Sequence, residues 1–490
     1  MNSSSPKITV ALLGCGMMGQ EHISYMKKYK NIKLKYLCDP NKNSIENALA
    51  VYYKDEQKMS DSAENNIAKV KSHDNLIVFD TEKEMFADPH VASEVDLLVI
   101  ATPNYCHTPQ LLKWARRSIT ILVEKPVAIS LGQVKALRAA SPNFKADIWV
   151  AMEYRYIPAI QKLLQVMDDI GPIKKIAIRE NRYPFLSKVK EWNKDIEKSG
   201  DTLVEKCCHF FDLFRLISQN EMKSCTTMVH RGLNFENYGY QHRSDNPVPI
   251  IDGAYVLMNF HEEKQFEKDE SSVKEETKES TRINHKTWNS APLGCLELCM
   301  FAEGSRHQEE IIVTGLNGRV EAYLPENKVF HYKRPNNIEW KDRTFPPPKS
   351  SIKEVIYDCS DLHDVYDFAD EIPQHSGYHY CSTAIEWKFL IDQIKAKNDP
   401  QIQRFIPQVS LEDGIKAVEM GISAMQNISN NDATAVENQH TSMLHQHPTI
   451  YPIVAFETLS SADLMKLALR NTLTNDTKSN VTNERKECDL

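Results

Sequence analysis

The feature that most limits the possible folds of this chain is the stretch GCGMMG, residues 14–19. It follows the apolar run KITVALL and precedes QEHISYMKKY, whose apolar residues have helical spacing. In a strand–turn–helix unit the first glycine permits the tight turn, the second lets a pyrophosphate approach the backbone, and the third lets the helix pack closely on the strand. The helix N-terminus favours negative phosphates. The stretch therefore predicts a dinucleotide-binding turn; the alternative is a glycine-rich turn that binds nothing.

An acidic residue ends the next predicted strand. Asp39 closes IKLKYLCD and lies 20 residues after Gly19. Its carboxylate could accept hydrogen bonds from the ribose hydroxyls of the adenosine, and it would repel a 2′-phosphate. This position favours NAD over NADP. Met17 and Met18 lie inside the turn, and we assign them to the cofactor contact as well.

Apolar strands alternate with helix-like segments up to about residue 156. The later apolar runs are LIVFD, VDLLVIATP, ITILVEKP and ADIWVAMEYRY. Such alternation predicts a parallel sheet covered by helices on both faces. We expect residues 1–156 to form a doubly wound Rossmann domain, with a polar loop or helical insertion at residues 55–75.

The pattern changes from about residue 157. DTLVEKCCHFFDLFRLI predicts one buried helix, and several strand-like stretches joined by turn residues predict a mainly antiparallel sheet. We expect residues 157–428 to form a second α/β domain around this large sheet. Residues 261–290 are highly charged and predict a disordered insertion. Residues 429–490 predict a polar, mostly disordered tail, with a docking helix at SADLMKLALRN as the alternative.

Composition and charge argue against several classes of protein. The formal net charge of -8 argues against a nucleic-acid or anionic-membrane partner. No apolar run reaches the roughly 18 residues of a membrane span, and the first residues lack the form of a signal peptide. The 11 cysteines are scattered and odd in number. Without a secretion signal they predict free thiols in a reducing compartment, so we expect a cytoplasmic protein.

Charged residues end one of the apolar strands. Glu124 and Lys125 close ITILVEKP, directly before Pro126. Ligands of open α/β sheets bind at the carboxyl ends of the strands, and a charged pair there is costly unless its charges are satisfied. The residues alone leave two interpretations open. Glu124 and Lys125 are either reactive groups that face a cofactor or a surface ion pair that caps the strand.

The chain resembles the glucose–fructose oxidoreductase / inositol dehydrogenase (Gfo/Idh/MocA) family. The matching pieces, in family order, are GCGMMGQEH, ATPNYCHTP, EKPVAISL, EYRYIPA and DTLVEKCCHFFD. The resemblance covers about residues 7–428 without the charged insertion. It implies an N-terminal Rossmann domain and a C-terminal α/β domain with a large, mostly antiparallel sheet. It also implies homodimers or homotetramers that form through the open face of that sheet.

The resemblance implies an NAD(P)-dependent dehydrogenase. Hydride would pass between the nicotinamide and a secondary hydroxyl of a sugar, a sugar derivative or an inositol-like polyol. Lys125 matches the catalytic lysine, which would bind the reacting hydroxyl and also contact the cofactor at the nicotinamide ribose, and Pro126 matches a cis-proline. We expect partial burial and the charge of NAD⁺ to lower the pKa of Lys125.

A second family motif, D-x-G-x-H-x-x-D, aligns with the stretch that begins at Glu205. His209 matches the catalytic histidine, and imidazole titrates near neutral pH, as a proton-transfer group should. Glu205 stands where an aspartate is usual, and Cys207 stands where a glycine is usual. Spacings of four and three would place Glu205, His209 and Asp212 near one helical face. Glu205 would then orient His209 or bind a substrate hydroxyl.

Two other readings of this segment involve no catalysis. A zinc site on the adjacent Cys207, Cys208 and His209 is disfavoured, because consecutive residues point in divergent directions. We therefore predict no metal. A buried helix with a purely structural role stays open.

Further site residues are assigned by position, each with a structural alternative. The cofactor side would include Thr102, Asn104, His107 and Glu124, although an ordinary capped helix start accounts equally well for the segment after Thr102. The substrate side would include Arg155, Asp212 and His379. A salt bridge to a neighbouring carboxylate is the alternative for Arg155, and a structural role is the alternative for His379.

Two alternatives to a polyol dehydrogenase remain from the sequence. The first is a catalytically weak family member that binds dinucleotide as a sensor or scaffold, which the glutamate at position 205, the charged insertion and the tail would suit. The second is a glycosidase that uses NAD transiently to oxidise and re-reduce a sugar.

Overall fold

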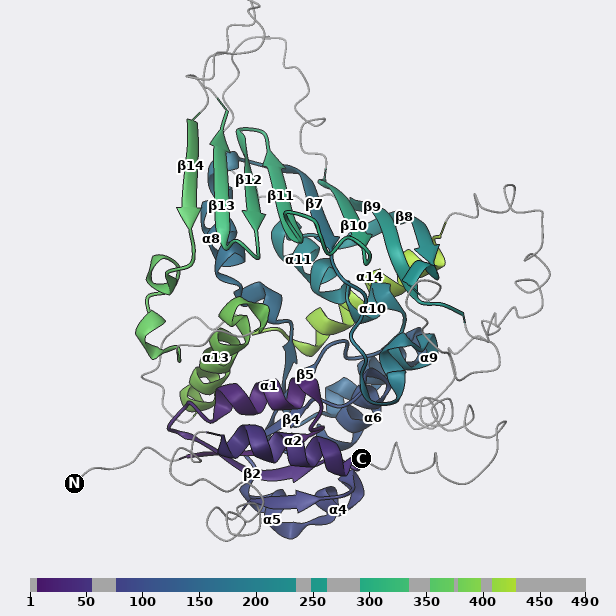
Figure 1. Ribbon diagram of the computed structural model, residues 1–490, viewed down its shortest axis with the longest axis vertical. Coiled ribbons are helices and arrows are strands. Elements are labelled where there is room, and N and C mark those ends of the chain that lie inside the picture. Colours follow the sequence, from purple (N-terminus) through teal and green to yellow (C-terminus); the bar gives the residue numbers. More distant parts are fainter. Residues whose placement is uncertain are drawn as a thin grey trace, which may run out of the picture.

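The computed structural model describes residues 7–54, 76–234, 248–261, 291–334, 353–373, 378–397 and 408–428. Two β-sheets dominate these residues, the first at the bottom and the second at the top of Figure 1. The expectations for residues 55–75, for nearly all of 261–290 and for 429–490 concern segments outside the described residues. No helix within the described ranges is long and apolar enough to cross a membrane.

The first sheet has six parallel strands in the order β3-β2-β1-β4-β5-β6. Its strands are β1 (Ile8–Leu13), β2 (Ile32–Cys38), β3 (Ile77–Phe79), β4 (Leu97–Ile100), β5 (Thr120–Glu124) and β6 (Asp147–Ala151). The helices between them are α1 (Met17–Met26), α2 (Lys42–Tyr53), α4 (Glu82–Ala87), α5 (Pro89–Glu94), α6 (Asn104–Trp114) and α7 (Leu131–Ala140). The central strands β4 and β5 are buried along their whole length, as continuous apolar runs predict. The predicted doubly wound sheet is confirmed.

The strand order reverses between β1 and β4. From β1 the chain proceeds outward through β2 and β3, and it then returns to place β4 on the other side of β1. Ligands of such sheets bind in the crevice at the carboxyl ends of the strands on either side of the reversal. The glycine turn, residues 14–19, follows β1 directly, so it lies at this edge of the sheet.

The second sheet has eight strands in the order β14-β13-β12-β11-β7-β10-β9-β8. They are β7 (Ile173–Asn181), β8 (Met222–Arg231), β9 (Ile251–Phe260), β10 (Leu293–Cys299), β11 (Glu309–Gly315), β12 (Gly318–Tyr323), β13 (Lys328–Lys333) and β14 (Lys353–Asp358). Only the pairing of β7 with β10 is parallel among the pairs of this sheet. The predicted large, mostly antiparallel sheet is confirmed.

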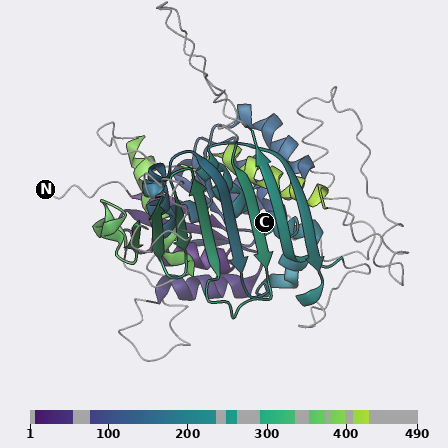
Figure 2. The same cartoon turned by 90° about the horizontal axis from the view of Figure 1, so that it is seen from above.

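Helices cover one face of the second sheet. Those in contact with its strands are α8 (Pro158–Val166), α10 (Thr202–Glu205), α11 (Cys208–Ser218) and α14 (Leu411–Gln426). The helices α9 (Ile196–Ser199) and α13 (Ser382–Ala396) pack instead against α6 and α1 of the first domain. Figure 2 shows the opposite face, over which no helix of the described residues passes. That face carries exposed apolar side chains, among them Met228, Tyr255 and Leu257.

The predicted single helix over residues 201–217 is wrong. The chain forms α10 and then α11, with Lys206 and Cys207 as the turn between them. The Cys207 N–H donates to the Thr202 carbonyl five residues back, at 3.1 Å, so the regular ladder is interrupted there. Glu205 and His209 therefore belong to different helices. The prediction that Glu205 lies on one helical face with His209 and Asp212 is wrong.

Candidate functional site

The glycine turn has the geometry that its sequence pattern predicts. Gly14 has a φ of +91°, and a Cβ added there would lie 2.4 Å from the Ala101 carbonyl oxygen. A Cβ at Gly19 would lie 2.1 Å from the Gly14 carbonyl oxygen, so α1 can approach β1 only without a side chain here. A Cβ at Gly16 would meet no heavy atom within 4 Å. The space over Gly16 is therefore open for a ligand that approaches the backbone.

The start of α1 fits a dinucleotide pyrophosphate. No side chain caps this helix at Gly16, and its first turn holds no acidic residue. The first N–H groups of the helix thus face the turn without a side-chain acceptor, and an anion is a suitable partner for them. Of the two methionines assigned to the cofactor, Met17 is 48% exposed at the turn, whereas Met18 packs against the core.

Asp39 lies beside the same turn, directly after β2. Its Oδ2 accepts a hydrogen bond from the Cys15 N–H at 2.7 Å, and its Oδ1 accepts one from the Asn41 N–H at 2.8 Å. Burial raises the pKa of Asp39, and the two backbone hydrogen bonds oppose that shift. Each oxygen keeps a lone pair, so the carboxylate has acceptors left for a ribose.

Thr102 and Asn104 follow β4, across the strand reversal from Gly14. The Thr102 hydroxyl donates to the Gln110 side-chain oxygen at 2.6 Å, and the Asn104 amide donates to the Ser199 carbonyl at 3.0 Å. Both side chains therefore have partners within the protein, and Asn104 joins α6 to α9. Their assignment to the cofactor stays a prediction.

His107 and Glu124 also make contacts within the fold. The two ring nitrogens of His107 lie 2.8 Å from the carbonyl oxygens of Pro126 and Thr102. The Glu124 carboxylate lies 2.9 Å from His22 Nε2. Both side chains are almost fully buried, so the structure gives them partners that hold the end of β5 in place.

Lys125 reaches from the end of β5 to the second domain. Its ammonium donates to the Glu205 backbone carbonyl at 3.0 Å and lies 3.8 Å from the Glu205 carboxylate. The Lys125–Pro126 peptide is cis, as the resemblance implied. The expected fall in its pKa is wrong for the protein alone: burial lowers it, but nearby carboxylates, led by Glu205, raise it above its ordinary value. Lys125 is a charged hydrogen-bond donor.

Glu205 is paired with two lysines. Besides Lys125, the Lys188 ammonium lies 3.4 Å from its carboxylate. Burial acts to raise the pKa of Glu205, but the charges of Lys125 and Lys188 outweigh it and lower the pKa to about 2. The carboxylate is therefore an anion at neutral pH that fixes Lys125. The hydrogen bonds and ion pairs of the described residues do not join it to His209, which it was expected to orient.

His209 lies in the first turn of α11 and contacts a different carboxylate. Its Nε2 lies 3.6 Å from Glu153 Oε1, and its ring stacks on Tyr154 with 4.4 Å between centroids. Its Nδ1 has no hydrogen-bond partner among the described residues. Burial lowers the pKa of His209 well below its ordinary value, and the charge of Lys125 adds to this. The imidazole is therefore neutral and is able to accept a proton.

Sequence reasoning missed Glu153 as a site residue. It starts the 3₁₀ turn η3 (Glu153–Tyr156), shortly after β6, and its side chain is almost fully buried. Burial raises its pKa to about 7. The signal that could have found it is the rule already applied to Glu124, because it too follows the carboxyl end of a parallel strand.

His379 lies on the far side of Glu153. It belongs to η10 (Tyr378–Cys381), and its Nε2 lies 3.8 Å from Glu153 Oε1. Its Nδ1 lies 3.0 Å from the Glu21 carboxylate. Burial lowers its pKa, but the hydrogen bond to Glu21 and the charge of Glu153 raise it to about 9. His379 is thus half-buried beside Glu153, and its assignment to the substrate stays a prediction.

Arg155 and Asp212 pair with each other. The Arg155 guanidinium donates to both oxygens of the Asp212 carboxylate, at 2.6 and 2.5 Å. This is the salt-bridge alternative for Arg155, and it ties η3 to α11. Their assignment to the substrate stays a prediction.

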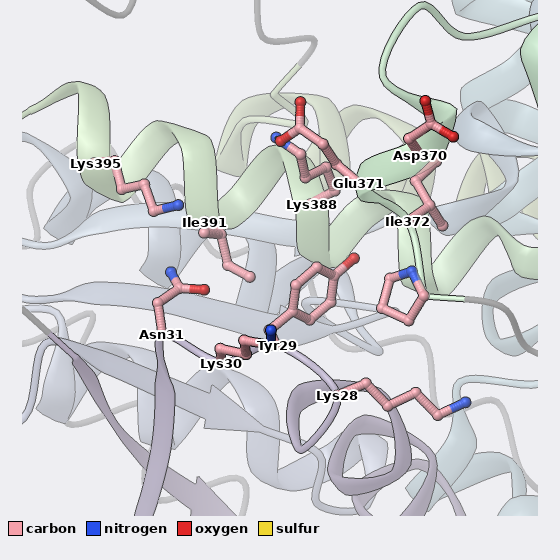
Figure 3. A pocket seen from close by; sticks show the side chains of 11 residues that line it. Lys28, Tyr29, Lys30, Asn31, Asp370, Glu371, Ile372, Lys388, Ile391 and Lys395 are labelled. Atoms are coloured by element: carbon pink, nitrogen blue, oxygen red, sulfur yellow. The ribbon is translucent and has the colours of Figure 1, made fainter. Parts of the chain in front are cut away.

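A separate cavity lies at the other end of α1 from the glycine turn (Figure 3). Its volume is about 340 Å³, and it opens between residues 28–31 and α13. Its lining includes Lys28, Lys388 and Lys395, and none of the predicted site residues. Within the described ranges, no group of three or more His, Cys, Asp or Glu side chains is arranged to hold a metal ion.

Comparison with protein families gives two matches that together span most of the chain. Residues 8–151 match the model of an oxidoreductase family with an NAD-binding Rossmann fold. Residues 165–436 match the C-terminal alpha/beta domain of the same oxidoreductase family.

Curated relatives match parts of the chain at low identity. Inositol 2-dehydrogenase of Rhizobium meliloti is 28% identical over 137 residues, which are 28% of this chain and 40% of that protein. The putative oxidoreductase YteT of Bacillus subtilis is 24% identical over 194 residues, 39% of this chain and 44% of that protein. The chain spans about half the length of the curated relatives it matches.

A solved structure shares the fold of nearly the whole molecule. A levoglucosan dehydrogenase in complex with NADH and levoglucosan superposes with a TM-score of 0.59 at 16% identity. The superposition covers 86% of this chain and 97% of that protein.

Proposed function

The chain belongs to the Gfo/Idh/MocA oxidoreductase family with an NAD-binding Rossmann fold, and from this we propose that it is an NAD-dependent dehydrogenase of a sugar, a sugar derivative or an inositol-like polyol. Hydride would pass between the nicotinamide and a secondary hydroxyl of the substrate. The names of its relatives, among them an inositol 2-dehydrogenase and a glucose-6-phosphate 3-dehydrogenase, support this substrate class.

The observation that carries the proposal is the position of Lys125. It leaves the carboxyl end of β5, at the ligand-binding edge of the parallel sheet, and contacts Glu205 from the second domain at 3.0 Å. The charge of Lys125 also lowers the pKa of His209. A charged donor and a neutral imidazole thus lie close together at the edge where the family binds NAD.

Different residues would bind the cofactor and carry out the proton transfer. The N-terminus of α1 and the open space over Gly16 would hold the pyrophosphate, and Asp39 would bind the adenosine ribose and favour NAD over NADP. Bound NAD supplies the hydride acceptor. Lys125 would donate a hydrogen bond to the reacting oxygen and stabilise the negative charge that develops on it. His209 would accept the hydroxyl proton.

Glu205 would act through Lys125. As an anion between Lys125 and Lys188, it keeps the catalytic ammonium charged and fixed in position. The glutamate in place of the family's usual aspartate is thus compatible with catalysis, because its partner here is Lys125 and not His209.

We also propose that the chain forms a homodimer or homotetramer through the uncovered face of the second sheet. Tyr255 is 53% exposed and Leu257 is 56% exposed on β9, the strand beside the edge strand β8. An apolar face of this kind marks an interaction surface. Sedimentation of the full chain should give a dimer or tetramer, and a monomer at micromolar concentration would contradict this proposal.

The proposed activity is tested on a panel of sugars, sugar acids and inositols. We expect the full chain to form NADH with at least one of them, and to prefer NAD to NADP. NADH binding without turnover of any member would favour the sensor or scaffold instead. Cleavage of a glycoside without net NADH would favour the NAD-dependent glycosidase.

A further inference from the structure

We propose that Glu153 is the carboxylate partner of His209 and receives, through the imidazole, the proton that leaves the substrate hydroxyl. This inference rests on the proposed dehydrogenase activity. It assigns Glu153 as a positioning and proton-accepting residue, whereas the sequence motifs gave the positioning of His209 to Glu205.

The geometry around His209 carries the inference. Its Nε2 faces Glu153 Oε1 at 3.6 Å, and its Nδ1 has no partner among the described residues. The ring plane is fixed by stacking on Tyr154 at 15° and 4.4 Å. One nitrogen thus faces a carboxylate, and the other is buried without a partner, so that a hydrogen bond from a bound substrate hydroxyl would satisfy it. The charge of a carboxylate on this side of the ring stabilises the imidazolium.

The titratable groups around Glu153 come from several elements. His209 and Cys208 face it from α11, and His379 faces it from η10. Glu124 and Lys125 act on it from the end of β5, and Glu386 lies within electrostatic reach on α13. Burial has the largest effect and raises the pKa of Glu153 to about 7, so Glu153 changes its charge in the neutral range.

The proton transfers balance without a further reactant. As the carbinol carbon gives up its hydride to the nicotinamide, the hydroxyl O–H bond breaks and a proton bonds to His209 Nδ1. The Nε2–H bond of the imidazolium then breaks, and that proton bonds to the Glu153 carboxylate. One neutral imidazole is restored and one carboxylate becomes a carboxylic acid, which accounts for the single proton released per hydride.

The surroundings of His209 explain why it needs such a partner. Burial and the charges of Lys125, Lys206 and His379 all lower its pKa. An imidazolium there is short-lived at neutral pH, whereas the carboxylate of Glu153 holds a proton readily under the same conditions. Transfer from His209 to Glu153 is therefore downhill.

The Glu153→Gln variant of the full chain tests the inference, because it keeps the size of the side chain and removes the proton acceptor. For the wild type we expect kcat/KM for polyol oxidation to rise with pH through about 7, where Glu153 loses its proton. In the variant this inflection should disappear and kcat should fall at least about tenfold. Unchanged turnover with the same inflection would overturn the inference.

Glu386→Gln is the matched control. Glu386 is also a fully buried glutamate, and burial raises its pKa well above its ordinary value. We expect this variant to keep the wild-type pH profile. Glu153→Asp should recover part of the rate and the inflection, because it restores a carboxyl group. Loss of the inflection in Glu386→Gln, or no recovery in Glu153→Asp, would contradict the assigned role.

A titration of the cofactor-free chain separates this inference from the proposed activity. The imidazole NMR signals of His209 should show a step near pH 7 in the wild type and in Glu386→Gln, and none in Glu153→Gln. An absent step in the wild type would overturn the pairing of Glu153 with His209 even if the chain reduces NAD. A step that depends on Glu153, in a chain that oxidises no polyol, would support the pairing and refute the proposed activity.

Discussion

At the scale of single residues, neighbouring charges decide what each side chain does. The sequence identifies Lys125 through its motif, yet the expected fall of its pKa does not occur, because Glu205 and other carboxylates surround the ammonium. Glu153 was missed for the related reason that its partner, His209, lies 56 residues further along the chain. A motif identifies residue types and spacing, whereas the pairs that set pKa values form only when distant segments meet.

Gly16→Ala should weaken NADH binding and leave thermal stability unchanged. A methyl group at Gly16 would meet nothing in the protein within 4 Å, but it would occupy the space over which the pyrophosphate approaches the backbone. We expect the Kd for NADH, measured by fluorescence titration, to rise at least about tenfold, a cost of roughly 1.4 kcal/mol.

Gly304→Ala is the control for this prediction. A Cβ at Gly304 would also meet nothing within 4 Å, and the residue lies in the connection between β10 and β11, away from the glycine turn. It should keep the wild-type Kd for NADH. An unchanged Kd in Gly16→Ala would argue against the pyrophosphate site.

At the scale of elements, the sequence predicts the strands better than the helix that carries the site. Apolar runs such as VDLLVIATP identify buried parallel strands because both faces of the sheet are covered. The break between α10 and α11 has no such signal. At this break the Lys206 ammonium lies 2.7 Å from the Tyr154 hydroxyl and pairs with Glu180 and Glu309, which come from strands distant in the sequence.

Gly421→Ala should destabilise the protein, because α14 packs against α10 at this glycine. A Cβ at Gly421 would lie 2.5 Å from the Leu203 carbonyl oxygen, which is closer than real contacts allow. We expect a loss of about 1–3 kcal/mol in unfolding free energy. Because α10 also carries Glu205, NAD reduction should fall as well.

Gly132→Ala provides the comparison within a helix. Gly132 is exposed in α7, and a Cβ there would have its nearest neighbour, Ser130 Oγ, at 3.8 Å. The change should be neutral or stabilise the protein by up to about 1 kcal/mol, because alanine favours the helix. Urea unfolding of both variants gives the free energies. Equal stability of the two would contradict the close packing of α10 on α14.

At the scale of the whole molecule, the candidate site is built from residues of both domains. Lys125 comes from the first domain, and Glu205 and His209 come from the second. The glycine turn, the strand order and the family could be predicted from the sequence because they depend on local patterns. The partners of Arg155, His379 and Glu205 could not, because they depend on how distant elements pack.

The most direct test of the account is the rate at which Lys125→Ala reduces NAD with the polyol that the wild type oxidises. Lys145→Ala, an exposed lysine of the first domain, is the control. We predict a fall of about 10²-fold or more in kcat for Lys125→Ala and an unchanged rate in Lys145→Ala. A Lys125→Ala variant that turns over at the wild-type rate would contradict it.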